Sequence, residues 1–218
     1  MEYIILIINF VIHLNQHLQD IISYFGGWSY FILFLVIFAE TGLVIAPFLP
    51  GDSLLFAAGA ICAIPNISIN IHILIIILFC AAVMGDSFNY FIGHLLGEKL
   101  FKDDAKILNT KYLIKTHNFF ERYGGKTIII ARFVPIIRTF APFIAGASEM
   151  TYKKFMFYNI VGAIIWVTSI TYLGYFFGGF PIVKNNFGIV VLAIIIISIT
   201  PALYEWFKFK RMSKKHLD

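Results

Sequence analysis

The sequence predicts an all-α integral membrane protein, and three observations support this prediction. The chain has 218 residues, of which 60% are hydrophobic and only 13% charged, whereas a soluble domain has about 25% charged residues. Its mean hydropathy is +0.84. Several apolar runs reach the roughly 20 residues that a helix needs to cross the hydrocarbon layer. We therefore expect residues 1–218 to form a single membrane domain.

Glycines, prolines and charges divide this domain into predicted segments. They are an amphipathic N-terminal helix at 1–27, a first re-entrant hairpin at 28–66, a transmembrane helix at 71–97, a cytoplasmic connector at 98–126, a second re-entrant hairpin at 127–147, transmembrane helices at 155–179 and 187–207, and a basic cytoplasmic tail at 208–218. The hairpins are predicted because residues that break helices interrupt short apolar runs. These breaks are Pro47, Pro50, Gly51, Pro135 and Pro142.

The distribution of basic residues predicts the orientation. No Lys or Arg precedes Lys99, and all 17 lie from Lys99 onward, mainly in the connector 99–126 and the tail 208–215. Basic segments next to membrane helices stay on the cytoplasmic side, so nucleic-acid binding is a poor explanation of the net charge of +5. With both anchors inside, the second hairpin should enter from the cytoplasm and the first from outside.

Four charged residues lie within the apolar hairpins: Glu40, Asp52, Arg132 and Arg138. A charge at the bilayer centre costs at least about 2.5–3.5 kcal/mol, so such residues normally face protein or water and have partners. The first half of the chain, up to Glu98, contains no lysine or arginine. A basic partner for either acid must therefore come from the second half, which predicts that the two hairpins meet.

The chemistry of these residues favours an anionic substrate and a proton. Arginine offers a planar fork suited to phosphate or carboxylate, and a buried carboxylate can carry a proton. Asp86, Asn89, Asn159 and Trp166 are candidates for a supporting polar site, although helix packing also explains them. A static ion network is the alternative for the four charges. No hydrolytic motif, metal site or cofactor site is apparent, so we expect no enzyme activity.

A weak internal repeat runs through the chain. Two broken segments and two spans echo each other: Phe48-Leu49-Pro50 with Ala58-Gly59-Ala60 matches Phe133-Val134-Pro135 with Ala145-Gly146-Ala147, and Phe91-Ile92-Gly93 with Gly97 matches Tyr172-Leu173-Gly174 with Gly178. Paired broken segments in the two halves of a membrane protein are typical of a transporter's midplane site. The predicted fold is therefore inverted-repeat-like.

These motifs together resemble the DedA family, also called the SNARE-associated or VTT-domain superfamily, over nearly the whole chain. The segments that carry the resemblance are Glu40-Thr41-Gly42-Leu43, Phe48-Leu49-Pro50-Gly51-Asp52-Ser53-Leu54-Leu55, Gly85-Asp86 with Asn89-Tyr90 and Ile92-Gly93, Gly124-Gly125-Lys126, Arg132-Phe133-Val134-Pro135 with Arg138-Thr139-Phe140-Ala141-Pro142, Ala145-Gly146, and Asn159 with Gly162-Ala163 and Trp166. One departure is His94, where relatives often have arginine.

The resemblance implies a lipid transporter or scramblase of the bacterial cytoplasmic membrane with two opposed re-entrant hairpins. It implies the return of undecaprenyl phosphate, an anionic lipid carrier, linked to the proton motive force. It also implies that Glu40, Asp52, Arg132 and Arg138 match the acids and arginines that the family needs. A passive phospholipid scramblase, a proton/cation antiporter and a non-transporting assembly factor remain alternatives.

Single-cysteine labelling tests the predicted orientation. In a background without Cys62 and Cys80, a cysteine placed near Lys115 should react only after the membrane is permeabilised, because basic segments stay in the cytoplasm. A cysteine within residues 181–186 should react from outside. Labelling near Lys115 from the outside alone would overturn the predicted orientation.

Overall fold

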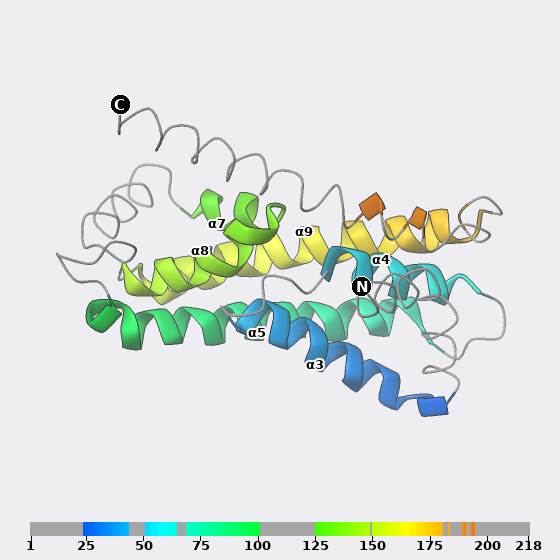
Figure 1. Cartoon of the computed structure of the whole chain (residues 1–218), viewed down its shortest axis with the longest axis horizontal. Helices are drawn as coiled ribbons and strands as arrows, with labels where there is room; N and C mark the ends of the chain where they lie inside the picture. The colour runs from blue at the N-terminus through cyan, green and yellow to red at the C-terminus, as the bar shows by residue number, and fades with distance from the viewer. Residues whose placement is uncertain are drawn as a thin grey trace, which may run out of the picture. The chain divides into compact units, whose positions relative to one another are not determined.

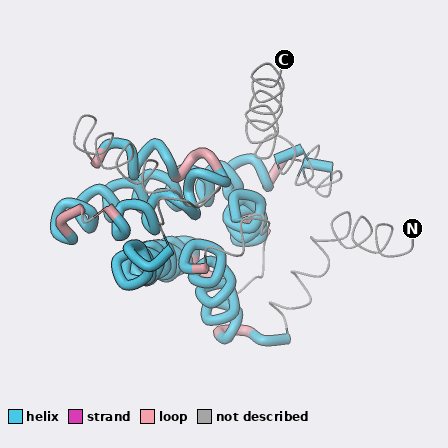
Figure 2. Tube along the Cα trace, turned by 60° about the vertical axis from the view of Figure 1, so that its left-hand side comes forward, coloured by secondary structure: helices cyan, strands magenta, loops and turns pink. Residues whose placement is uncertain are grey.

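A computed structural model describes residues 24–43, 51–64, 69–100, 125–148 and 150–180, with a few isolated positions between 183 and 194. These residues are helical apart from short turns, and no strand occurs among them (Figure 2). The helices are α3 (Trp28–Gly42), α4 (Gly51–Cys62), α5 (Ile71–Leu100), α7 (Lys126–Ala131), α8 (Pro135–Ala147) and α9 (Tyr152–Gly178). The all-helical prediction is confirmed.

Among the described residues, two helices are long and apolar enough to cross a membrane. They are α5 over Ile71–Leu96 and α9 over Tyr152–Gly178, close to the predicted spans. The 26 residues of the first give a length of about 39 Å, which exceeds the roughly 30 Å of hydrocarbon. In the most apolar 18-residue stretch of each helix, only 39% of α5 and 33% of α9 is buried within the protein. Outward-facing residues such as Ile76, Phe88 and Phe157 are apolar, as contact with lipid requires.

Helices flank both predicted breaks. Helices α3 and α4 stand on either side of residues 43–50, and α7 and α8 on either side of residues 132–134. In the second break Val134 has extended backbone and Pro135 begins α8, where its missing amide hydrogen costs nothing. Pro142 lies inside α8. The re-entrant path of each pair through the bilayer stays a prediction.

Several predicted segments lie outside the described residues. They are the amphipathic helix up to residue 23, the breaks Pro47 and Pro50, the connector from residue 101 to 124, most of the span at 187–207 and the basic tail. Gly51, by contrast, is described as the first residue of α4.

The chain divides into two compact units. The larger unit comprises residues 25–51 and 68–169, and so contains α3, α5, α7, α8 and most of α9. The smaller unit comprises residues 1–24, 52–67 and 170–218. Its described part contains α4 from Asp52 onward and the end of α9.

In the larger unit, α5 packs against both α3 and α8 (Figure 1). Small residues permit the close approach. Gly42 of α3 lies against Gly85 of α5, and a side chain added at Gly93 or Gly146 would overlap the backbone of the facing helix. Small residues are the usual means of packing helices in membranes, because they let the backbones come close.

Both units use the same helix crossing. A glycine on the short helix faces a carbonyl of the long helix, and a glycine on the long helix faces the carbonyl of a phenylalanine three residues earlier on the short one. The matched contacts are Gly59 with Thr171, Gly174 with Phe56, Gly146 with Tyr90 and Gly93 with Phe143. The sequence repeat therefore corresponds to a repeated packing arrangement within each unit.

Replacing Gly93 with leucine should destabilise the fold, because the new side chain must displace the Phe143 backbone. Overpacking costs about 1–3 kcal/mol, and a rigid backbone neighbour places this change at the upper end. The matched control is Gly27→Leu, where nothing lies within 4 Å of the added Cβ. Thermal unfolding of the purified proteins in detergent compares them. Equal unfolding midpoints would contradict the crossing.

Candidate functional site

Four ionisable side chains of opposite charge are buried together in the larger unit. We call this group the charge cluster; its members are Glu40, Asp86, Arg132 and Arg138. Each side chain is buried, with at most 4% of the residue exposed. They come from α3, α5, the α7–α8 break and α8. Two carboxylates and two guanidiniums have formal charges that sum to zero. This balance matters because an uncompensated buried charge is strongly destabilising.

Glu40 joins the two broken segments. Its Oε1 accepts a hydrogen bond from Arg138 Nη2 and another from the Gly51 backbone amide at 3.0 Å. The first amides of a helix have no partner within the helix, and Gly51 begins α4. Any side chain at Gly51 would overlap the Glu40 carboxylate. The contact between halves, predicted from the absence of bases before Lys99, is confirmed by the Glu40–Arg138 pair.

Arg132 pairs with Asp86, rather than with an acid of the first broken segment. Its Nη2 lies 2.5 Å from Asp86 Oδ2 and also donates to Asn159 Oδ1. Asn159 Nδ2 donates in turn to the Val83 carbonyl at 3.1 Å. Helices α5 and α9 therefore hold the Arg132 side chain between them.

Trp166 of α9 lies beneath both arginines. The Cζ atoms of Arg138 and Arg132 are 4.7 Å and 5.8 Å from its ring centroid, within the range of cation–π attraction. Gly162, one turn earlier, leaves room for this arrangement, since a Cβ there would lie 3.1 Å from Arg132 Cδ. The sequence predicts Asn159 and Trp166 as parts of a supporting polar site, with helix packing as the alternative. In the structure both residues contact arginines of the charge cluster.

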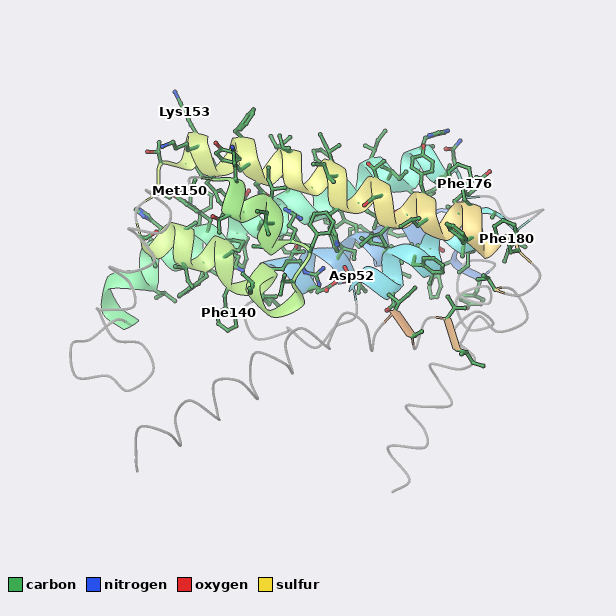
Figure 3. The ribbon with its side chains drawn as sticks, turned by 90° about the horizontal axis from the view of Figure 1, so that it is seen from above. Asp52, Phe140, Met150, Lys153, Phe176 and Phe180 are labelled. Carbon is green, nitrogen blue, oxygen red and sulfur yellow. The ribbon has the colours of Figure 1, made fainter. Side chains whose placement is uncertain are left out.

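Asn89 and Asp52 complete the predicted set. Asn89 lies one turn after Asp86 on α5, and its Nδ2 donates to the carbonyls of Thr41 and Thr139. Asp52 is partly exposed in the first turn of α4 (Figure 3) and belongs to the smaller unit. The structure therefore brings all the predicted charged and supporting residues except Asp52 into one unit. A role for Asp52 stays a prediction.

The sequence predicts Asp86 only as a supporting residue. In the structure Asp86 is the direct ion-pair partner of Arg132. The available signal was its position: an acid in the middle of a crossing helix is as costly to bury as Glu40. Thr41 and Thr139 were not identified as site residues at all. Their contribution to Asn89 is through backbone carbonyls, which no side-chain motif reveals.

The donors of this site suit an anion. A guanidinium donates hydrogen bonds and accepts none, and its fork matches the oxygens of phosphate or carboxylate. Among the described residues, no three His, Cys, Asp or Glu side chains come together as metal ligands would. Outward apolar helices around a buried charge cluster define an integral membrane protein with an internal polar site.

Comparison with known proteins identifies the family. The VTT domain matches residues 49–176, which include every predicted charged site residue except Glu40. The chain belongs to the DedA family of membrane proteins.

Three relatives illustrate this membership. The chain is 49% identical over 216 residues to the protein DedA of Escherichia coli, covering 99% of both chains. It is 45% identical over 172 residues to an uncharacterized membrane protein of Mycobacterium tuberculosis, covering 78% of this chain and 75% of that one. It is 35% identical over 157 residues to the inner membrane protein YqjA of Escherichia coli, covering 72% and 70%. No solved structure gives a significant match.

Removing the Asp86 carboxylate should destabilise the protein, because Arg132 then stays buried without its counter-charge. The expected cost of Asp86→Ala is about 3–5 kcal/mol. The double variant Asp86→Ala/Arg132→Met removes both charges and should recover part of that loss. Ser87→Ala is the neighbouring control, since the Ser87 hydroxyl bonds only to its own helix at Val83. Thermal unfolding in detergent measures all three. A double variant less stable than Asp86→Ala would contradict the pairing.

Proposed function

We propose that the protein is a proton-linked transporter that moves an anionic lipid across the bacterial cytoplasmic membrane. One observation carries this proposal: two buried guanidiniums lie side by side over Trp166, each bonded to a carboxylate. A phosphate headgroup can replace a carboxylate on such a fork. The substrate proposed is undecaprenyl phosphate or a related phospholipid, and this choice rests on the family resemblance. The protein acts as a carrier and not as an enzyme.

The exchange at Arg138 links the anion to a proton. When Arg138 leaves Glu40 to bind a phosphate oxygen, the buried Glu40 carboxylate loses its guanidinium counter-charge. Such a charge is costly, so Glu40 takes up a proton as the phosphate enters and releases it as the phosphate leaves. The arginine keeps its own proton throughout. Arg132 keeps its hydrogen bonds to Asp86 and Asn159. It therefore acts as the fixed cation of the site.

The membrane assignment supports the same proposal. YqjA, which is 35% identical, is named an inner membrane protein. We place this chain in the cytoplasmic membrane with its basic tail inside, as the distribution of Lys and Arg predicts. The protons and the lipid are its proposed partners.

One observation favours a different function. In each ion pair of the charge cluster, the acid neutralises the arginine that it binds. A static network that only holds helices together would have the same pairs. A non-transporting assembly factor would have the same geometry. The two functions differ in whether the pairs exchange partners, and lipid flip measures that exchange.

In proteoliposomes, the protein should flip undecaprenyl phosphate much faster than undecaprenol, which has the same tail and no charge. Arg138→Lys should slow this flip by about tenfold or more, because hydrogen bonds to charged groups contribute about 1.5–3 kcal/mol and lysine lacks the planar fork. Arg211→Lys in the basic tail is the matched control. Glu40→Gln should abolish the dependence of flip on a pH gradient.

Each alternative predicts a different result in this assay. Equal flip of both lipids, insensitive to the gradient, indicates a passive scramblase. Cation-dependent proton movement without flip indicates an antiporter. Neither activity, with normal folding, indicates an assembly factor. Size-exclusion profiles and unfolding midpoints show that each variant is folded before its rate is interpreted.

A further inference from the structure

We propose that Asn89 is a positioning residue that holds the two broken segments in register, so that Glu40 meets Arg138. Its side-chain amide is fully buried and donates from Nδ2 to two carbonyls, that of Thr41 at 3.2 Å and that of Thr139 at 2.7 Å. An asparagine amide has two hydrogens on this nitrogen. Both are used, one for each broken segment.

The two acceptors are next to the charges of the cluster. Thr41 directly follows Glu40 on α3, and Thr139 directly follows Arg138 on α8. Asn89 itself stands on α5, which packs against both of these helices (Figure 1). Asn89 therefore fixes the backbone beside each member of an ion pair whose partners are 98 residues apart in the chain.

The first carbonyl is available because α3 ends there. The helix finishes at Gly42, and the last carbonyls of a helix have no amide four residues later to bond. Leu43 continues in extended backbone and its amide returns to Ala39. The carbonyl of Thr41 is thus open to a donor from another helix. A buried carbonyl within a membrane needs such a donor, because no water is available there.

The second carbonyl lies in the turn of α8 that precedes Pro142. Proline has no amide hydrogen, and its ring pushes away the carbonyl four residues earlier, which belongs to Arg138. The turn opens at this point, and side chains of neighbouring helices commonly satisfy the backbone groups that such a proline frees. Asn89 bonds the neighbouring carbonyl of this turn, that of Thr139. Its amide therefore contacts both the last turn of α3 and the turn of α8 that contains the proline.

Removal of the Asn89 amide should change the geometry of the Glu40–Arg138 ion pair as well as the stability of the protein. If the segments shift without this amide, the Arg138 guanidinium moves relative to Glu40 and to the Trp166 ring 4.7 Å away. Trp166 is therefore a built-in reporter of the register. The transport readout below rests on the proposed function, whereas the Trp166 readout does not.

The test uses the full chain with Trp28→Phe and Trp206→Phe, so that fluorescence comes from Trp166 alone. Asn89→Leu has a similar size and no hydrogen bond. It should change the emission and anion quenching of Trp166 and slow undecaprenyl phosphate flip by about tenfold, as the loss of two hydrogen bonds predicts. Ser87→Ala is the matched control on the same helix, because its hydroxyl bonds only to the Val83 carbonyl. It should change neither readout.

A double-mutant cycle separates positioning from mere stability. In a Glu40→Gln background the pair to be positioned is already lost, so Asn89→Leu should slow the remaining flip far less than about tenfold. Equal slowing in both backgrounds, or unchanged Trp166 emission, would overturn the proposal. If Asn89→Leu does not fold, Asn89→Ser keeps one donor and should give an intermediate result in both readouts. If the unaltered protein flips no lipid, the proposed function fails, and Trp166 emission alone decides the role of Asn89.

Discussion

Charge neutralisation inside an apolar environment is the constraint on which the larger unit depends. Glu40, Asp86, Arg132 and Arg138 are buried where an uncompensated charge is costly. Each arginine bonds an acid on another helix. These bonds fix the rotation of α3, α5 and α8 about their axes, since every helix must turn its polar residue to the same point. The glycine contacts of α5 then bring the backbones close enough for the bonds to form.

The breaks in the helices create a second demand that the same residues meet. Backbone groups freed inside a membrane need partners, because no water is available there. Glu40 accepts the Gly51 amide at the start of α4, and Asn89 donates to carbonyls at the end of α3 and within α8. A change in an ion pair is therefore also a change in how the breaks are satisfied. This coupling is the physical basis for linking local chemistry to movement of a broken segment.

Hydropathy and charge predicted the two spans that α5 and α9 form and the meeting of the halves, but not which acid meets which arginine. The absence of bases before Lys99 required a contact between halves. The choice of Asp86 for Arg132 depends on helix rotation and on the end point of α7, which hydropathy does not encode. The bonds of Asn89 were also hidden, because their acceptors are backbone atoms. Trp166 was predicted as a supporting residue, but its position against both guanidiniums was not.

The repeat duplicates packing without duplicating chemistry. In the alignment that the glycine contacts of the two units define, Asp86 of α5 corresponds to Val167 of α9, and Trp166 of α9 corresponds to Gly85 of α5. One long helix thus supplies the acid and the other supplies the aromatic platform. Among the described residues of the smaller unit, the only charged one is Asp52. A second complete cluster would repeat the cost of burying four charges. In the proposed transport, the anion binds at the charge cluster of the larger unit, where both arginine pairs lie.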